Sequence, residues 1–316
     1  MMYLILLSLA TLGACMDYSD HLGRSISFPL SAAMYSQQPS SCLQEKFGIS
    51  TLKEYSVKLG GGSCSGLIVN LPAINATALV FRAELAKPSK FVEKWFELFV
   101  PFTTWRHGGK VSKFLEKAFR KLWLKGGMKR DFKEIMKQRG NDEVLVTGYS
   151  LGGGVASLVA VDIVKDGLVD GNKVTLITLG QPMVGDQDFA TEYEQEVEQS
   201  FRVVRVGDSL PHSPGEDRGY QYNGREVFYS DSGMPRNGFK ICKNVTEDGC
   251  SGSQTSPIRL RGNDDYFGKN VRDYGEKCVR VRYASWFHTS PTSKDHPGAE
   301  AGKDAKNHSH TVSGLD

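Results

Sequence analysis

The chain has little net charge, and after its N-terminus it has no long apolar run. Among its 316 residues, 39 Lys and Arg stand against 36 Asp and Glu, and the formal charge of +3 is too small to indicate binding to nucleic acid. No segment past the N-terminus is apolar over the roughly 20 residues needed to cross a membrane. We find no internal repeat, and we expect no cofactor and no metal. With 40% hydrophobic and 10% aromatic residues, the chain can bury a large core.

The N-terminus predicts an export signal. Residues 3–12 are apolar but too short to span a bilayer, and the small residues Gly13 and Ala14 follow them. The segment lacks Lys and Arg, and its end, Leu12–Cys15, also resembles a bacterial lipoprotein box. We favour a eukaryotic secretory route, with 1–14 as signal peptide and a secreted, extracellular glycoprotein as the product. The reason is a set of three N-glycosylation sequons, which begin at Asn75, Asn244 and Asn307.

The six cysteines form an even set, which is consistent with three disulfides in an oxidising compartment. Sequence alone allows fifteen pairings of six cysteines. They are Cys15, Cys42, Cys64, Cys242, Cys250 and Cys278.

Predicted strands and helices alternate along the chain, which argues for a mostly parallel α/β sheet flanked by helices. Beyond Cys278 the periodicity ends, and we expect residues 279–316 to form a disordered tail. Strands are expected over 65–70, 76–82, 143–147, 173–179 and 201–206, and helices over 111–124, 128–138, 151–165 and near 186–199.

A serine lies between a predicted strand and a predicted helix in the sequence Gly148-Tyr149-Ser150-Leu151-Gly152. Strand, tight turn and helix form the context in which G-x-S-x-G acts as a nucleophile elbow. Gly148 and Gly152 would leave room for the turn, and the N–H of Leu151 at the helix start would face an oxyanion. The alternative is a chance glycine-serine turn.

Residues 110–139 are locally basic, with eleven Lys or Arg against three acids. Apolar residues between 111 and 122 follow the i, i+3, i+4, i+7 spacing of an amphipathic helix. Its polar face is either simply solvated or attracted to an anionic lipid surface.

Four ordered motifs together resemble the fungal-type class 3 lipases, and most of all the secreted nematode members of that family. The resemblance covers about residues 17–278, and implies an α/β-hydrolase domain over 15–278 that hydrolyses carboxylic esters of lipids at a lipid–water interface through a Ser-Asp-His triad. The motifs are Phe81-Arg82, Gly148–Gly153, Leu179–Gly185 and Arg202–Pro211, followed by the strand Glu226–Tyr229.

Two triad positions match the family and one does not. The resemblance makes Ser150 the nucleophile and Asp208 the acid that orients an imidazole. The family histidine precedes a Tyr-Phe-Gly segment, and here Asn263 occupies that position. Asn cannot accept the Ser150 proton near neutral pH, so we expect impaired activity. His296 in the tail is an alternative base, while His212 resembles a structural position of the family.

The resemblance also implies an oxyanion hole, a lid and a disulfide scheme. The N–H groups of Glu84 and Leu151 would form the oxyanion hole, although Ala83-Glu84 replaces the usual Gly followed by Thr or Ser. The apolar helix expected over 90–100 is either the family's lid or a buried core helix. The implied pairs are Cys15–Cys278, Cys42–Cys64 and Cys242–Cys250, unless signal cleavage after Cys15 leaves Cys278 unpaired.

The sequence therefore predicts a secreted lipase-like hydrolase of lipid esters, weakened at its base. The main alternative is a non-catalytic lipid-binding protein on a lipase fold. A remoter one is a hydrolase of other esters, such as plant-wall esters or phospholipids. The oligomeric state is not predicted.

Overall fold

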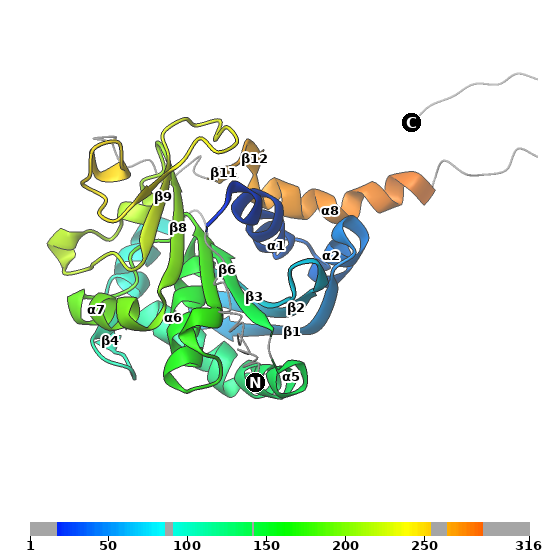
Figure 1. Cartoon of the computed structure of the whole chain (residues 1–316), viewed down its shortest axis with the longest axis horizontal. Helices are drawn as coiled ribbons and strands as arrows, with labels where there is room; N and C mark the ends of the chain where they lie inside the picture. The colour runs from blue at the N-terminus through cyan, green and yellow to red at the C-terminus, as the bar shows by residue number, and fades with distance from the viewer. Residues whose placement is uncertain (1–17, 86–90, 141, 254–263, 287–316) are drawn as a thin grey trace, which may run out of the picture. The chain divides into compact units, whose positions relative to one another are not determined.

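The computed structural model describes residues 18–85, 91–140, 142–253 and 264–286 (Figure 1). Its contacts separate residues 1–281 from 282–316, and of the second unit only the last residues of one helix are described. All features below belong to the first unit, apart from residues 282–286 at the end of that helix.

A single eight-stranded sheet forms the centre of this unit, with the strand order β1-β2-β3-β6-β7-β8-β9-β10. Strands β3, β6, β7, β8 and β9 are parallel, while β1, β2 and β10 add to the two edges in antiparallel pairing. The strands are β1 (Ser50–Leu59), β2 (Gly62–Leu71), β3 (Ala76–Leu85), β6 (Glu143–Tyr149), β7 (Val174–Leu179), β8 (Gln199–Arg205), β9 (Arg225–Tyr229) and β10 (Lys240–Cys242). The predicted fold class, a mostly parallel sheet between helices, is confirmed.

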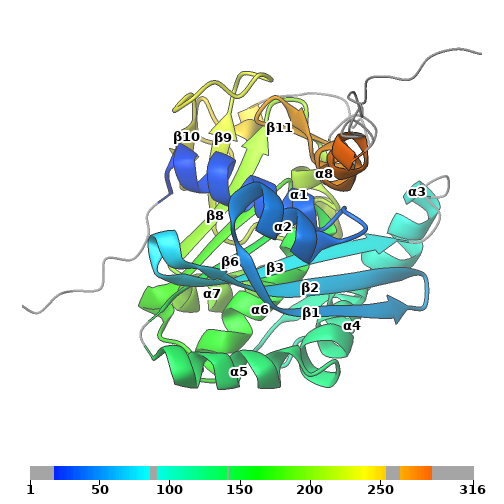
Figure 2. The same ribbon diagram turned by 90° about the vertical axis from the view of Figure 1, so that its right-hand side faces the viewer.

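The central strands are buried on both faces, because helices cover both sides of the sheet. Along β6, Val144 and Val146 face one apolar cluster, whereas Leu145 faces the other. Figure 2 shows the two helical layers above and below the strands. One layer holds α4 (Lys113–Phe119), η5 (Arg120–Lys125), α5 (Met128–Arg139), α6 (Leu151–Lys165) and α7 (Gln187–Glu196), and the other holds η1 (Leu22–Ser27), α1 (Phe28–Ala33), α2 (Pro39–Phe47) and α8 (Val271–Trp286).

Shorter elements lie outside the eight-stranded sheet. Two small hairpins pair β4 (Phe102–Thr104) with β5 (Lys110–Ser112), and β11 (Asp265–Tyr266) with β12 (Lys269–Asn270). The helix predicted over 111–124 thus begins only after β5, and it continues as the π-helical turn η5. The remaining short helices are η2 (Pro72–Ile74), α3 (Phe91–Lys94), η4 (Trp95–Phe99), η6 (Gly171–Lys173), η7 (Leu210–His212), η8 (Glu216–Arg218) and η9 (Ser251–Ser253).

One predicted disulfide is confirmed and two are wrong. Cys242 and Cys250 are bonded, but Cys278 on α8 joins Cys42 on α2, with the two Cα atoms 5.5 Å apart. Cys42–Cys64 is ruled out by the sheet itself, since the two side chains lie in the apolar clusters on its opposite faces. Cys64 is a free, buried thiol, and burial raises its pKa. Cys15 lies outside the described residues.

The C-terminal boundary also differs from the prediction. Helix α8 continues to Trp286, so residues 279–286, which the sequence assigned to a disordered tail, are helical. The rest of the tail and the predicted signal peptide lie outside the described residues. Within the described ranges, no helix is both long and apolar enough to cross a bilayer.

Candidate active site

Ser150 occupies a sharp turn between β6 and α6. Its backbone angles are φ 57° and ψ −126°, a combination that residues other than glycine rarely adopt. The backbone of Ser150 is therefore strained. Its N–H donates to the Leu179 carbonyl at 2.8 Å, which ties the turn to the neighbouring strand β7. The predicted sequence of strand, turn and helix is confirmed.

The two glycines of the motif are needed where backbones meet. A Cβ on Gly148 would lie 2.5 Å from the carbonyl carbon and oxygen of Gly152. A Cβ on Gly152 would lie 2.3 Å from the carbonyl oxygen of Phe81, at the point where β3 passes the elbow. Both contacts are closer than any side chain allows, so the elbow depends on both glycines. Leu151 is the first residue of α6, where backbone N–H groups lack partners within the helix.

Asp208 follows β8 at the same end of the sheet as Ser150, where the parallel strands finish. It is buried, with 4% of its surface exposed, and one carboxylate oxygen accepts the Leu210 N–H at 3.0 Å. Burial raises the pKa of this carboxyl. The end of β7 connects it to the elbow: Leu179 accepts from Ser150, and a Cβ on the next residue, Gly180, would lie 3.0 Å from the Asp208 Oδ2. The structure therefore brings the two predicted triad residues to adjoining positions.

A segment near the C-terminus closes this arrangement. The Tyr266 hydroxyl donates to Asp208 Oδ2 at 2.6 Å, and its ring packs edge-on against Tyr149, the residue before Ser150, with ring centroids 5.9 Å apart. Tyr149 in turn donates its hydroxyl to Asp264 at 2.6 Å. Burial, followed by the nearby Asp208 carboxylate, raises the pKa of Tyr266 well above its usual value, so its hydroxyl stays a neutral donor.

Sequence reasoning used Tyr266 only to locate the histidine position, and missed its contact with Asp208. The signal was present in the Tyr-Phe-Gly segment itself. Asn263, three residues before Tyr266, lies outside the described residues, as does His296.

The three histidines in the described part of the chain make no hydrogen bond to Ser150 or Asp208. His212 bonds through Nδ1 to the Tyr222 hydroxyl at 2.9 Å, and burial lowers its pKa. His107 contacts Asp162 at 2.9 Å, eleven residues along α6 from Leu151 and hence about 16 Å away at 1.5 Å per residue. His21 is exposed beside η1.

Glu84, expected to contribute to the oxyanion hole, still lies inside β3, opposite Ser63 of β2. Its carboxylate is held by two guanidinium groups: Arg82 contacts one oxygen, and Arg272 of α8 donates to the other at 2.6 Å. Burial opposes the charge of Glu84, but the two arginines outweigh it and lower its pKa. Both guanidinium groups also lie over the ring of Tyr35, so the Glu84 side chain belongs to a packed, charge-balanced cluster.

The segment expected as a lid consists of α3 and the π-helical turn η4. Trp95 and Phe99 stack with their centroids 4.1 Å apart, and both are buried, whereas Phe96 is 50% exposed. Tyr220 holds the end of the turn by donating to the carbonyls of Phe99 and Val100. The structure thus gives this segment one face in the core and one exposed aromatic residue.

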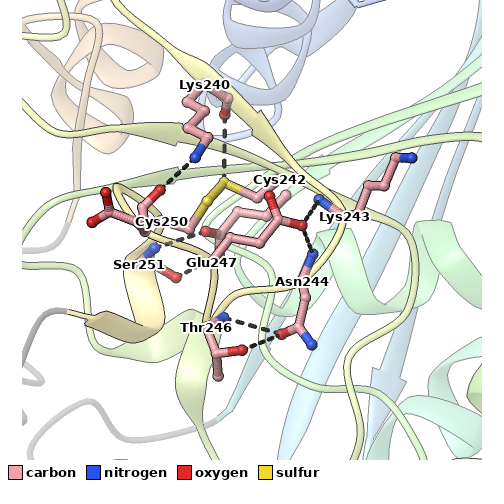
Figure 3. The surroundings of a disulfide bond; sticks show 10 residues. Lys240, Cys242, Lys243, Asn244, Thr246, Glu247, Cys250 and Ser251 are labelled. Carbon is pink, nitrogen blue, oxygen red and sulfur yellow. Dashed lines mark hydrogen bonds between the residues drawn. A yellow bond between two sulfur atoms is a disulfide. The ribbon is translucent and has the colours of Figure 1, made fainter.

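Among the described residues, two groups of side chains could in principle bind a metal ion, but their ligand atoms already have other partners. The first group is His107, Asp162 and Asp166, whose carboxylates form ion pairs with Lys129 and Arg106. In the second group, Glu226 with Cys242 and Cys250, the two sulfurs form a disulfide. Figure 3 shows the loop that this disulfide closes, in which Asn244 accepts hydrogen bonds from the Thr246 N–H and hydroxyl, each at 3.0 Å.

Comparison with known proteins agrees with this geometry. The profile of the family described as Lipase (class 3) matches residues 78–218, the span from β3 to the turn after Asp208. A lipase of Caenorhabditis elegans is 30% identical over 283 residues, which cover 78% of this chain and 79% of the relative. A lipase of Rhizomucor miehei is 33% identical over 138 residues, or 43% of this chain and 37% of the relative. Lipase II from Rhizopus niveus has a similar structure, with a TM-score of 0.64 at 20% identity over 80% of this chain and 96% of that one.

The mostly parallel sheet with helices on both faces is that of the α/β-hydrolase fold. The chain belongs to the class 3 lipase family, as its sequence motifs indicated.

Proposed function

We propose that this protein is a secreted, lipase-like hydrolase of lipid carboxylic esters, with Ser150 as nucleophile and Asp208 as acid, and that its activity is impaired by Asn263. The observation that carries the proposal is the strained Ser150 turn, joined through Leu179 and Gly180 to the buried Asp208. Strain of this kind persists only where the surrounding structure holds it, and it clusters at functional sites.

The chemistry follows from these positions. The Ser150 oxygen attacks the ester carbonyl, and the N–H groups of Leu151 and Glu84 donate to the resulting oxyanion. The Ser150 proton must leave to a base, and the amide of Asn263 is too weakly basic to take it near neutral pH. Loss of the triad histidine lowers kcat on the order of 10⁶-fold in subtilisin. We expect a loss of the same kind here.

A non-catalytic lipid-binding protein is the second candidate. It is favoured by the Tyr266 hydroxyl, which already donates to the Asp208 oxygen Oδ2, and by the ion pairs that hold Glu84 in place of an oxyanion-stabilising hydroxyl. In this case the site would bind an ester or acyl chain without turnover.

Secretion and glycosylation form part of the same proposal. Two disulfides among the described residues support an oxidising compartment. The proposed extracellular site of action is a lipid–water interface.

A fluorophosphonate probe separates the two candidates, because it reacts only with an activated serine hydroxyl. Slow labelling of the purified mature protein, lost in Ser150→Ala, is the result expected for an impaired hydrolase. Lipid binding by a folded protein that never labels would favour the binding protein instead.

A further inference from the structure

A row of three lysines lies next to the predicted lid. Lys113 and Lys117 are on α4, and Lys121 is on η5. The Lys121 ammonium donates to the backbone carbonyl of Lys58, near the end of β1, at 3.3 Å, and the Lys117 ammonium would lie 3.2 Å from a Cβ on Gly60, in the turn after β1. We call these three lysines the lysine strip.

The strip borders the end of the sheet where Ser150 lies. The β1–β2 turn is at this end because Gly62 pairs with Leu85, the last residue of the parallel strand β3. A Cβ on Gly61, in the same turn, would lie 2.5 Å from the side chain of Leu98 in η4. Figure 2 shows α3 above the turn end of the β1–β2 hairpin and α4 beneath the hairpin.

The charges of the strip are not neutralised locally. None of the three lysines forms an ion pair with a carboxylate in the part of the chain that the structure describes. Glu116, the acid on α4, forms an ion pair with Arg120 at 3.0 Å. The predicted lid also carries two acids, Glu93 and Glu97, whose side chains are more than half exposed. Both form ion pairs with Lys94, and not with the lysine strip.

The rest of the basic segment is different, because its charges are mostly paired. On α5, carboxylates neutralise four basic residues, so that the free positive charge concentrates on α4 and η5. These pairs are Lys129 with Asp162 and Asp166, Arg130 with Asp131, Lys137 with Glu134, and Arg139 with Asp142.

Apolar side chains accompany the strip. Phe96 is 50% exposed, and Leu98 is partly exposed beside the β1–β2 turn. Cations next to exposed aromatic and aliphatic residues suit the boundary of a bilayer, where phosphate and carboxylate groups lie just above the acyl chains.

We propose that the lysine strip docks the protein on anionic lipid surfaces, with the η4 side chains against the lipid. The proposal rests on the lipid interface of the proposed function, but it does not require ester hydrolysis. Each lysine near such a surface contributes about a fivefold gain in affinity, so three together contribute about 10²-fold.

The test is sedimentation of the full-length mature protein with vesicles of phosphatidylcholine alone, or of phosphatidylcholine mixed with phosphatidylserine. The variant Lys113→Gln/Lys117→Gln/Lys121→Gln should bind the anionic vesicles about 10²-fold more weakly than wild type. A matched control, Lys133→Gln/Lys137→Gln/Lys173→Gln, removes the same charge from a hollow at the opposite end of the sheet, where β6 and β7 begin, and should change binding less than about threefold.

Arginine replacement of the same three strip lysines keeps the charge and should keep the binding. The preference for anionic vesicles should disappear at about 1 M salt, where the Debye length is about 3 Å. Wild-type protein that binds both vesicle types equally, or equal losses in the two glutamine triples, would overturn the proposal. Fluorophosphonate labelling of Ser150 is measured separately, so failure of the docking surface is distinguished from failure of the hydrolase.

Discussion

Asp162 on α6 offers a test of how the helices of one layer are held together. The side chain is fully buried, and its two oxygens accept from four donors. These are Trp123 Nε1 at 2.7 Å, Lys129 Nζ at 2.6 Å, Arg106 Nη1 at 2.7 Å and His107 Nε2 at 2.9 Å. Replacement by asparagine removes the charge and one acceptor, and leaves buried donors without a partner.

The expected loss can be worked out from these contacts. Breaking a buried ion pair by removing one partner costs about 3–5 kcal/mol. Asp166 remains as a partner for Lys129 and Arg106, and Arg106 is 40% exposed, so we take the lower end, about 3 kcal/mol. At about 2–4 °C per kcal/mol for a large domain, the melting temperature should fall by about 6–12 °C.

The same site makes a prediction about pH. Burial alone would raise the pKa of Asp162, but the hydrogen bonds from His107, Lys129 and Trp123 outweigh it and lower the pKa. Stability from a lowered carboxyl pKa is present above the unfolded value of about 3.9, and is lost as pH falls through the folded value. The difference in free energy of unfolding between wild type and Asp162→Asn should therefore narrow below about pH 4.

Urea unfolding followed by circular dichroism, at neutral and at acid pH, measures both effects. Asp166→Asn is the control, since the Asp166 side chain is 28% exposed and should cost no more than about 1 kcal/mol. This reasoning would be refuted if the free energy of unfolding of Asp162→Asn were within about 1 kcal/mol of the wild-type value at neutral pH, or if the difference between the two did not change with pH.

Three further predictions concern the elbow, the acid and the covalent bridge. Gly152→Ala would place a Cβ against the Phe81 carbonyl, and should cost at least about 1–3 kcal/mol in a denaturant melt; an unchanged midpoint would mean that the turn tolerates a side chain. Burial raises the pKa of Asp208, so ionisation of this carboxyl lowers the free energy of unfolding at pH values above the unfolded pKa. Asp208→Asn should therefore raise the melting temperature relative to wild type more at pH 7 than near pH 4, and the opposite trend would contradict the assignment. Removing the Cys42–Cys278 bridge with Cys278→Ser should cost about 2–5 kcal/mol of unfolding free energy, and peptide mapping that joins Cys278 to another cysteine in wild type would exclude the pairing.

The central part of the fold could be predicted because its signals are local. Helix α6 begins at Leu151 and ends at Lys165, as the apolar run after the elbow indicated. Strand β1 was missed although Tyr55, Val57 and Leu59 alternate with polar residues, because this alternation covers only its second half and a register shift between Thr51 and Lys53 interrupts the first half. The packing of α8 was missed for a different reason. It depends on contacts such as Cys278 with Cys42, and no local pattern encodes which sheet face a cysteine will occupy.

The candidate site divides in the same way. The Ser150 turn follows from its own strand, glycines and helix, and Asp208 was reached through the family resemblance. The partners that set the chemistry come from distant segments: Tyr266 reaches Asp208 across 58 residues, and Arg272 reaches Glu84 across 188. Periodicity and spacing carry no information about such pairs.

The central claim is that this family member retains the serine and the acid but lacks the base. Its most direct test is the turnover of a short p-nitrophenyl ester by purified mature wild type beside Asn263→His, with Ser150→Ala in the Asn263→His background as control. We predict wild-type turnover at least about a thousandfold below the enzyme median of about 10 s⁻¹, a measurable gain in Asn263→His, and loss of that gain with Ser150→Ala. Wild-type turnover near 10 s⁻¹, or no gain in a folded Asn263→His protein, would contradict it.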